Sequence, residues 1–221
     1  MKYLGSKTIE TDRLILKAQT MAEQQYLWSV LMQPDVNRYY LTVPKKFAEK
    51  LKDWDKQEEY YKKDMEHAND LDVFRWSIFI KETGQCIGRV SCHPANDEDS
   101  KINNPSIRGV GWFIDPKFKG NGYGNEAAKA MMDYMFNECE IDEIRTGAAI
   151  QNPASWKIME KFGFCKLNKT KMVKYTIQTK ETECYCYEIT KDDYTRLDEL
   201  NNNINRYDAE VFLVDLNKAK K

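Results

Sequence analysis

The sequence lacks a C-x-x-C pair, although it contains six cysteines. Structural zinc sites and redox-active dithiols commonly use such pairs, so the cysteine spacing supports neither kind of site. Cys184 and Cys186 alternate within a strand-like segment and therefore point to one face of it. We expect buried thiols that act as small core residues, and no metal site.

Long apolar runs and a net charge are also missing. No apolar run approaches the roughly 20 residues that span a bilayer, and Met1–Ser6 contains no signal-peptide core. The formal net charge of -1 creates no field that would attract nucleic acid or anionic lipid. We therefore expect a cytoplasmic protein with no membrane partner and no direct nucleic-acid partner.

The composition is that of an ordinary globular chain, with 42% hydrophobic and 31% charged residues among 221. We expect one domain over residues 1–190 and a C-terminal extension over residues 191–221. Leu197, Leu200 and Ile204 have helical spacing and Val211–Val214 is apolar, which predicts a docked, helical extension. It would cover a sheet edge, close a pocket or join a second subunit, so a monomer and a homodimer both stay open.

Apolar periodicity predicts an α/β (α+β) fold with a mixed sheet. Apolar residues with helical spacing follow Thr20 and continue to Leu31, and Pro34 is expected to end this helix. The same spacing recurs in Phe47–Tyr61, Glu126–Met135 and Pro153–Met159. The segments that fit strands are Arg13–Lys17, Phe74–Ile80, Cys86–Cys92, Ile107–Ile114, Ile144–Ile150 and Glu183–Ile189. The turn Glu82–Gln85 makes the second and third of these an antiparallel hairpin.

A glycine-rich loop lies between a predicted strand and a predicted helix. Lys119–Gly124 has glycine at its second, fourth and sixth positions. Such a loop turns successive backbone N–H groups toward one point, and the helix dipole adds positive potential there, which suits a pyrophosphate. The spacing differs from the dinucleotide fingerprint G-x-G-x-x-G and from the P-loop. Glycines in a tight turn also have a purely steric use, so the loop alone does not distinguish an anion site from an ordinary strand-to-helix turn.

Two motifs in the expected order resemble the GCN5-related N-acetyltransferase (GNAT) superfamily. The family signature R/Q-x-x-G-x-G/A is similar to Lys119–Gly124, with lysine at its first position. A second family segment, an asparagine followed by a helix ending in E-K-x-G-F, is similar to Asn152–Phe164. Thr11–Leu16 and Gly111–Pro116 look like the RimJ/RimL-like branch, which acetylates ribosomal-protein N-termini. The resemblance covers about Ile9–Thr190.

The resemblance implies a mostly antiparallel central sheet whose fourth and fifth strands splay apart to admit the pantetheine arm of acetyl-CoA. Asn152, after the fifth strand, would bind the arm from one side. The other partners of the pantetheine arm would be the backbone groups of Trp112, Phe113 and Ile114. The pyrophosphate would be held by Lys119, Gly120, Asn121, Gly122, Tyr123 and Gly124. For the side chains of Trp112 and Phe113 we expect core packing.

The implied reaction is direct attack of a primary amine, on a protein N-terminus or a small molecule, on the thioester carbonyl. A strand amide near Phe113 or Ile114 would stabilise the oxyanion. The acceptor depends on loops such as Pro34–Pro44 and Asp97–Pro105, whose shape the sequence does not give. Two alternatives stay open for Tyr39, Tyr40 and Trp54: they line an acceptor site, or they pack in the core or on the surface.

Two expected catalytic side chains are missing, because Met159 and Gly109 occupy the positions where relatives often carry a tyrosine acid and a glutamate base. Ser155 is a candidate to hydrogen-bond the leaving thiolate, although a serine in a first helical turn is also an ordinary cap. His93 is a candidate base, because histidine is the residue type best suited to proton transfer near neutral pH, or it is a structural strand-end residue. We expect a working acetyltransferase; the alternative is an acyl-CoA-binding sensor.

Overall fold

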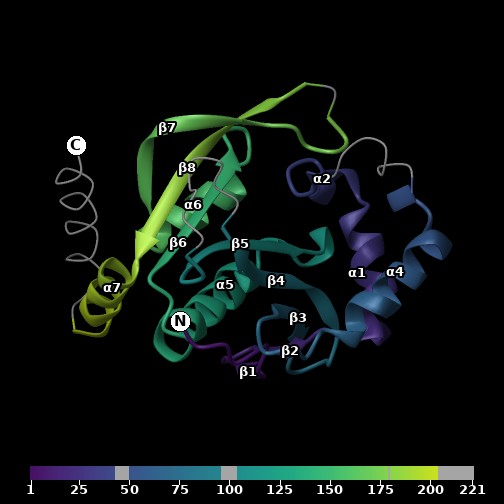
Figure 1. Ribbon diagram of the computed structural model, residues 1–221, viewed down its shortest axis with the longest axis horizontal. Coiled ribbons are helices and arrows are strands. Elements are labelled where there is room, and N and C mark those ends of the chain that lie inside the picture. The colour runs from purple at the N-terminus through teal and green to yellow at the C-terminus, as the bar shows by residue number, and fades with distance from the viewer. Residues whose placement is uncertain (43–49, 96–103, 179, 204–221) are drawn as a thin grey trace. The chain divides into compact units, whose positions relative to one another are not determined.

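The computed structural model describes residues 1–42, 50–95, 104–178 and 180–203 (Figure 1). Phe47, Ile204, Val211–Val214 and most of the Asp97–Pro105 loop lie outside the described residues. The elements are β1 (Ile9–Glu10), β2 (Leu14–Ala18), α1 (Met21–Leu31), α2 (Pro34–Asn37), α4 (Trp54–Glu66), β3 (Phe74–Ile80), β4 (Cys86–Pro94), β5 (Ile107–Ile114), the 3₁₀-helix η1 (Pro116–Phe118), α5 (Tyr123–Asp133), the π-helix η2 (Tyr134–Glu138), β6 (Glu143–Ala149), α6 (Pro153–Lys161), β7 (Cys165–Val173), β8 (Thr182–Thr190) and α7 (Lys191–Asn203).

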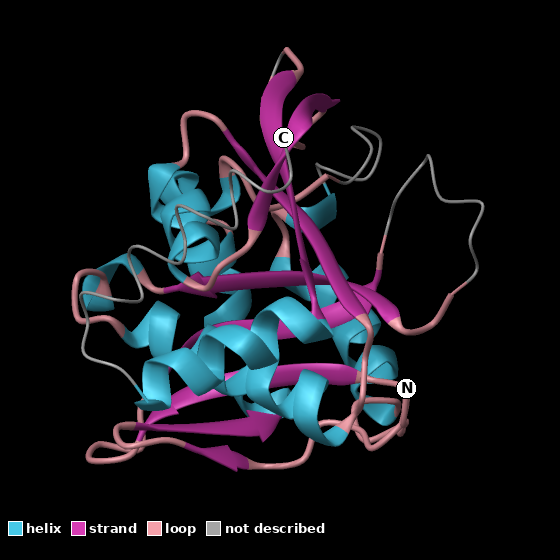
Figure 2. Ribbon diagram, turned by 90° about the vertical axis from the view of Figure 1, so that its left-hand side faces the viewer, coloured by secondary structure: helices cyan, strands magenta, loops and turns pink. Residues whose placement is uncertain are grey.

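The strands form one sheet of eight in the order β1-β2-β3-β4-β5-β6-β8-β7 (Figure 2). Strand pairs β1–β2, β2–β3, β3–β4 and β6–β8 are antiparallel, whereas β5 and β6 are parallel. The parallel register comprises Ile107↔Glu143 and Arg108↔Ile144. The predicted α/β class with a mixed, mostly antiparallel sheet is therefore confirmed, while the splay of the two parallel strands stays a prediction.

Sequence analysis missed the strands β1 and β7. The first is two residues long, which is too short for a periodic pattern. Most side chains of β7 are exposed, and its lysines include Lys166, Lys169 and Lys171. Lysines on an edge strand discourage pairing with another chain, but they also remove the apolar alternation by which a strand is recognised.

The chain divides into two compact units. The first unit comprises Met1–His93, Val110–Glu140 and Val173–Thr182. The second comprises Pro94–Gly109, Ile141–Met172 and Glu183–Lys221. Each unit is described by itself below.

In the first unit, neighbouring residues of β3 show which helices cover each face of the sheet. The Trp76 ring packs edge-on against Tyr134 of η2, with centroids 5.7 Å apart. The adjacent Ser77 instead donates a hydrogen bond to Glu23 of α1, over 2.8 Å. Since consecutive strand residues point to opposite faces, α1 and η2 lie on opposite faces of this strand.

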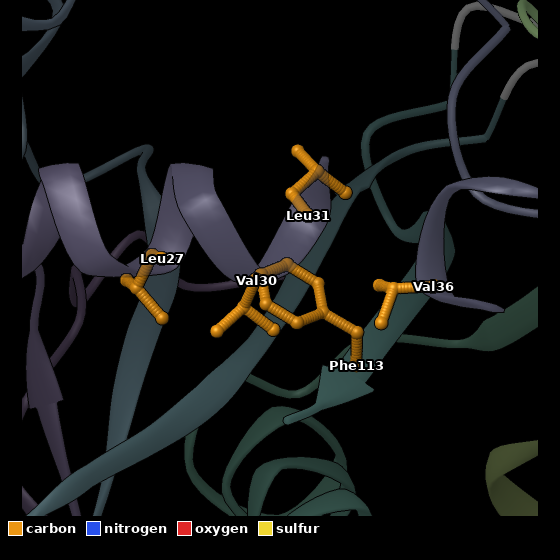
Figure 3. Packing of buried hydrophobic residues seen from close by; sticks show 5 residues of the cluster. All are labelled: Leu27, Val30, Leu31, Val36 and Phe113. Carbon is orange, nitrogen blue, oxygen red and sulfur yellow. The ribbon is translucent and has the colours of Figure 1, made fainter. Parts of the chain in front are cut away.

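The core on the α1 face contains Phe113 of β5 (Figure 3). Its ring is 5% exposed and packs with Leu27, Val30 and Leu31 of α1 and Val36 of α2. Burying a side chain of this size contributes about 1.5–3 kcal/mol. The predicted core role of the Phe113 side chain is confirmed, whereas Trp112 is only half-buried.

Helix ends in the first unit follow capping rules. Thr20 caps α1 in a capping box, in which the Glu23 carboxylate accepts from the Thr20 N–H over 2.7 Å. The predicted end at Pro34 is wrong in detail: α1 ends at Leu31 and Pro34 begins α2, because proline suits a first helical position.

The continuous helix predicted over Phe47–Tyr61 is wrong. Its described part breaks at Lys52–Asp53, and α4 starts afresh at Trp54 and continues to Glu66. The Asp53 carboxylate accepts from the N–H of Asp55, which caps the new helix. Figure 1 shows α1 beside α4, and the ring centroids of Trp28 and Trp54 lie 5.5 Å apart.

The second unit is built on the β6–β8 ladder, covered by α6. Gly147 pairs with Cys186 in this ladder, and a Cβ at Gly147 would lie 2.7 Å from the carbonyl oxygen of Tyr185. Only glycine permits this backbone approach. Gly163, with φ +77°, ends the turn after α6, directly against Leu197 of α7. The start of α7 is thus packed, and the domain boundary predicted at residue 190 stays a prediction.

The remaining predictions concern the cysteines, metal sites and membrane-spanning helices. Cys92, Cys139, Cys184 and Cys186 are buried, as predicted for core thiols, whereas Cys86 and Cys165 are only partly buried, so the prediction is wrong for these two. No group of metal-ligating side chains appears among the described residues. In the same part of the chain, no helix combines the length and apolar character needed to cross a membrane.

Candidate functional site

The glycine loop begins at a fixed point, because Asp115 anchors the end of β5. Asp115 is 1% exposed, and its Oδ1 accepts from the N–H of Lys117 over 3.0 Å, which caps η1. Its Oδ2 accepts from the Tyr26 hydroxyl over 2.6 Å. Burial, reinforced by this carboxylate, raises the pKa of Tyr26, so the hydroxyl stays a donor. Helix α1 and the strand end are thereby tied together.

The loop itself has the backbone of an anion cradle. Gly120 and Gly122 have φ values of +83° and +79°, in the left-handed region where glycine is favoured. A Cβ on Gly120 would meet no atom within 4 Å. Gly122 is the N-cap of α5, and no side chain caps the first N–H groups of that helix. Lys119, at the start of the loop, is exposed. Helix N-termini of this kind bind phosphate groups.

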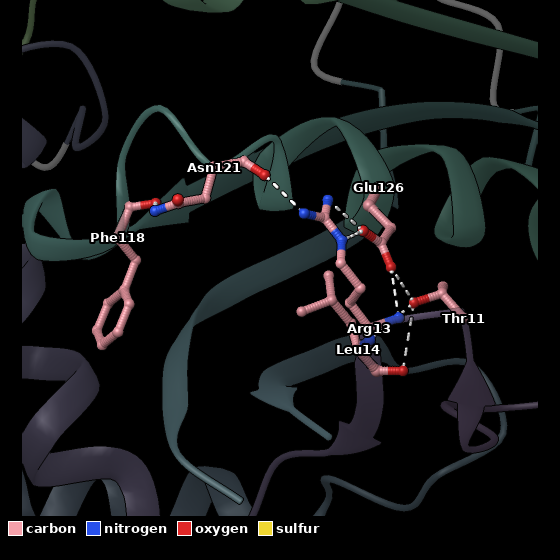
Figure 4. Close-up of polar contacts among 6 residues, drawn as sticks. All are labelled: Thr11, Arg13, Leu14, Phe118, Asn121 and Glu126. Atoms are coloured by element: carbon pink, nitrogen blue, oxygen red, sulfur yellow. Dashed lines mark hydrogen bonds and ion pairs between the residues drawn. The ribbon is translucent and has the colours of Figure 1, made fainter. Parts of the chain in front are cut away.

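A network from the connection between β1 and β2 holds this loop (Figure 4). The Arg13 guanidinium donates to the carbonyl oxygen of Asn121 over 2.9 Å and pairs with Glu126 of α5 through nitrogen–oxygen distances of 2.6 and 2.7 Å. Thr11 also donates to the Glu126 carboxylate. The Arg13 guanidinium lies over the Tyr123 ring, 4.8 Å from its centroid. The sequence motif that carries the family resemblance at the N-terminus is therefore part of the loop's support, a role that sequence analysis missed.

Glu126 is the acceptor at the centre of this network. Burial alone would raise the pKa of Glu126, but the hydrogen bonds from Thr11 and Arg13 outweigh burial and hold that pKa below its ordinary value. The side chain of Glu126 is 18% exposed. The carboxylate is therefore ionised at neutral pH and cannot relay protons there.

The end of β5 has a definite main-chain orientation. The carbonyl of Phe113 points at Gly88 of β4, so closely that a Cβ at position 88 would overlap its oxygen. The N–H of Asp115 donates to the carbonyl of Ile87 over 2.7 Å. Residues 113 and 115 thus direct their main-chain groups toward β4, and strand alternation turns those of Trp112 and Ile114 away from β4.

An aromatic and cationic cluster lies on the α1 face of the same strands. The rings of Tyr40 and Phe113 meet edge to face, with centroids 5.2 Å apart. The Arg89 guanidinium, from β4, donates to the Tyr40 hydroxyl over 3.1 Å. Gly111 lies next to Tyr40, and a Cβ at position 111 would lie 3.5 Å from the Tyr40 hydroxyl oxygen. Tyr40 was one of the side chains left open between an acceptor site and packing.

The candidate residues Asn152 and Ser155 lie together in the second unit. Asn152 is the N-cap of α6 and Ser155 is the third helical residue, so the alternative interpretation of Ser155 as the cap is wrong. The side-chain amide of Asn152 donates to the Ser155 hydroxyl over 3.2 Å, which leaves the serine proton available to another acceptor. Met159, where relatives carry the tyrosine, is 3% exposed and packs in the core.

The other predicted residues belong to the first unit. His93, the candidate base, is exposed near the end of β4. Trp112, Phe113, Ile114 and the loop Lys119–Gly124 also lie in this unit. The structure thus brings the loop, its support and the end of β5 together, and Asn152 and Ser155 are held next to each other in the other unit.

The first unit also contains a cavity of about 330 Å³ between α1 and the β3–β4 hairpin. Its lining consists of Ala22, Glu23, Tyr26, Phe79, Gly84, Gln85 and Cys86. Burial raises the pKa of the Cys86 thiol to about 11, so the thiol is neutral near pH 7 and a poor nucleophile. The carboxylate of Glu23, which also lines the cavity, already accepts hydrogen bonds from Thr20 and Ser77. This cavity therefore offers no reactive group.

The sequence profile described as "Acetyltransferase (GNAT) domain" matches residues 13–165. The chain belongs to this family and is an N-acetyltransferase. It is 29% identical over 162 residues to the uncharacterized protein YkkB of Bacillus subtilis, an alignment that covers 72% of this chain and 87% of YkkB. The uncharacterized N-acetyltransferase p20 of Bacillus licheniformis is 23% identical, over 72% of this chain and 83% of p20.

Solved structures share the fold at low sequence identity. A ribosomal-protein-S5-alanine acetyltransferase from Vibrio fischeri has a TM-score of 0.67 at 15% identity, covering 86% of this chain and 99% of that chain. A spermidine N-acetyltransferase from Vibrio cholerae, in complex with CoA and spermine, has a TM-score of 0.65 at 19% identity, covering 84% and 99%. These likenesses support the family fold.

Proposed function

We propose that the chain transfers the acetyl group of acetyl-CoA to a primary amine, with the loop Lys119–Gly124 binding the pyrophosphate. The observation that carries this proposal is the loop's backbone: Gly120 and Gly122 are left-handed, the space over Gly120 is open, and the loop starts the eleven-residue helix α5. Diphosphates suit such a site because several N–H groups and the helix dipole act together.

The strand end then accounts for the pantetheine arm. Trp112 and Ile114 turn their main-chain N–H and C=O groups away from β4, so they are the groups we assign to the arm. Phe113 directs its carbonyl toward β4 and contributes its side chain to the core instead. Of the two amides first considered for the oxyanion, that of Ile114 is the better oriented.

For the chemical step, Ser155 hydrogen-bonds the leaving thiolate and Asn152 positions Ser155 through the hydrogen bond between their side chains. His93 is the candidate base that removes a proton from the acceptor ammonium. The acetyl carbonyl carbon gains the amine nitrogen and loses the CoA sulfur, which leaves as a thiol after receiving a proton. No metal takes part in this scheme.

The acceptor is a primary amine, on a peptide N-terminus or a small molecule. Both classes are represented among the similar structures, one named for a ribosomal protein and one for spermidine. We further propose that the chain acts in the cytoplasm.

The test is acetyl transfer from acetyl-CoA to a panel of N-terminal peptides, polyamines and monoamines. Released CoA is best measured by chromatography, since Cys165 is partly exposed and would consume a thiol reagent. Mass spectrometry of the acceptor should show one added acetyl group. Tight acetyl-CoA binding without transfer to any amine would support the sensor alternative instead, and absence of acetyl-CoA binding would refute the loop's assigned role.

A further inference from the structure

Arg89 is a cation whose hydrogen-bonding capacity is mostly unused. It lies on β4 opposite Ser77 of β3. Its guanidinium donates to the Tyr40 hydroxyl, while the buried Nε has no hydrogen-bond partner among the residues that the structure describes. An arginine has five N–H donors in a fixed fork. The guanidinium carbon lies 5.4 Å from the centroid of Phe113 and 5.6 Å from that of Tyr40, so two aromatic rings flank the charge.

The charge of Arg89 is also not neutralised locally. Among the described residues, no carboxylate lies within ion-pair distance of its guanidinium. The acid that acts on it electrostatically is Asp64 of α4. Asp64 is already paired with Arg75 over 2.6 Å. The set Asp64, Arg75 and Arg89 therefore carries one net positive charge.

Such an arrangement is unfavourable without a ligand. Removing a cation from water is costly unless an anion or several hydrogen bonds replace the solvent. Cation–π contacts with two rings return only part of this cost. By contrast, Arg13, Arg75 and Arg145 each have a carboxylate partner at 2.6–2.7 Å. The unpaired fork of Arg89 fits an incoming carboxylate, which guanidinium binds with two parallel hydrogen bonds.

The location of Arg89 connects it with the proposed reaction. Tyr40, its hydrogen-bond partner, lies over Gly111, and Ser91 donates to the Gly111 carbonyl over 3.4 Å. Gly111 directly precedes Trp112, the first residue assigned to the pantetheine arm. The cluster is thus on the strand along which the acetyl group would lie.

The segment that carries Tyr40 is held in place. The N–H of Thr176 donates to the carbonyl of Leu41 over 2.8 Å, and the Gln178 side chain donates to the carbonyl of Arg38 over 2.9 Å. The Tyr39 ring also packs edge-on against Tyr175. A positioned segment keeps the Tyr40 hydroxyl on Arg89 and preserves the geometry of the fork.

From these contacts we infer that Arg89 and Tyr40 form an anion subsite of the acceptor site, which binds a carboxylate carried close to the accepting amine. The inference rests on the proposed acetyl transfer and names its substrate class. The carboxylate belongs either to a free amino acid or to an acidic residue near a peptide N-terminus. A polyamine is disfavoured, because its second ammonium would be repelled by the Arg89 charge.

The experiment compares acceptors that differ by one carboxylate. One pair is alanine and alaninamide, which tests the free amino acid. The other pair is the peptide amides Ala-Glu-Ala and Ala-Gln-Ala, which tests the acidic peptide. Spermidine serves as the polycation. For the wild-type chain we expect kcat/KM to favour the carboxylate member of at least one pair by roughly 10-fold or more, since one charge-assisted contact is worth about that factor.

Variants of the same chain assign this preference to the subsite. Arg89→Gln should reduce the ratio between paired acceptors to about one, mainly through KM, and Arg89→Lys should retain part of it because lysine keeps the charge but lacks the fork. Tyr40→Phe should reduce the ratio less. Arg38→Gln removes an exposed cation from the same segment and should leave the ratio unchanged.

The ratio is insensitive to a general loss of activity, so a partly destabilised variant still gives a result. A wild-type ratio near one in both pairs, a preference for spermidine, or a ratio that persists in Arg89→Gln would overturn the anion subsite while leaving acetyl transfer intact. Failure to acetylate any of the five acceptors, with acetyl-CoA bound, would instead count against the proposed function on which the subsite rests.

Discussion

Two arginines of the first unit, Arg13 and Arg89, are used in opposite ways. Arg13 meets a carboxylate, a backbone carbonyl and an aromatic ring, so its charge is neutralised within the protein. Arg89 meets one hydroxyl and two rings and has an unpaired Nε. A satisfied cation stabilises a structure, whereas an unsatisfied one is available to a ligand. The cofactor side that we propose is thus supported by paired charges, and the acceptor subsite that we infer depends on an unpaired one.

The largest effect that tests the cofactor side is expected from Gly124→Ala. A Cβ at this position meets only the Ile114 side chain at 3.6 Å, an ordinary contact, and no positive φ is involved. Alanine is the better helix former by about 1 kcal/mol, so the fold should be kept or stabilised. If the cofactor approaches this backbone, the methyl group should weaken CoA binding about 10- to 100-fold, as loss of one charge-assisted hydrogen bond would.

Isothermal titration with CoA measures this loss, and thermal unfolding checks the fold. The matched control is Gly84→Ala in the β3–β4 turn, where φ is +68° and no atom lies within 4 Å of the added carbon. It should lower stability through backbone strain and leave CoA affinity unchanged. Equal affinities of wild type and Gly124→Ala would argue against close approach of the cofactor to this part of the loop.

A smaller effect is expected from breaking the support of the loop with Glu126→Gln. The change leaves Arg13 without its carboxylate and should lower the free energy of unfolding by about 1–3 kcal/mol at pH 7. CoA affinity should also fall, by roughly 10-fold or less, because Asn121 loses a fixed partner. Denaturant unfolding and CoA titration measure the two effects. Arg13→Lys, which keeps the charge but cannot hold both Asn121 and Glu126, should lie between wild type and Glu126→Gln.

The stabilisation from Glu126 has a definite pH dependence. The pKa of Glu126 is lower in the folded than in the unfolded chain, so its contribution is present above the unfolded value and is lost as pH falls through the folded value. The stability difference between wild type and Glu126→Gln should therefore be constant near neutrality and shrink in acid, as the pH falls below the ordinary pKa of a glutamate side chain. A difference that grows on acidification would contradict this account.

The smallest effect is expected in the second unit, from Ser155→Ala. Its hydroxyl accepts from Asn152, so the substitution removes this hydrogen bond together with the one that we propose to the leaving sulfur. We expect kcat to fall about 2- to 10-fold, which is the value of a single neutral hydrogen bond, with CoA affinity nearly unchanged. Single-turnover kinetics measure this step. A normal rate would remove Ser155 from the mechanism, and a loss above 100-fold would make it a true general acid.

Much of the fold was predictable from local patterns. Strands such as Phe74–Ile80 have alternating apolar residues, and Thr20 begins a helix with a capping box that is visible in the sequence. The break before α4 was missed because a local rule, the Asp53 cap, overrode the periodicity around it. Strand β7 was missed because its lysines are exposed.

The candidate site was predictable only where glycine is required. The left-handed φ values of Gly120 and Gly122 follow from their residue type, so the loop could be located in advance. The Arg13–Glu126 pair and the Arg89–Tyr40 pair join residues 113 and 49 positions apart. Contacts of this range are set by packing and register, which one sequence does not reveal.

The bond between Arg13 and Asn121 also has a consequence for how the protein becomes competent. It links residues 108 positions apart, and closing such a loop is entropically slow compared with forming α5. We expect helix α5 to form from local contacts, and the loop Lys119–Gly124 to gain its support only when residues 11–13 have docked. Recovery of CoA binding during refolding should therefore lag behind recovery of helical signal, which makes the cofactor a reporter of the last step of folding.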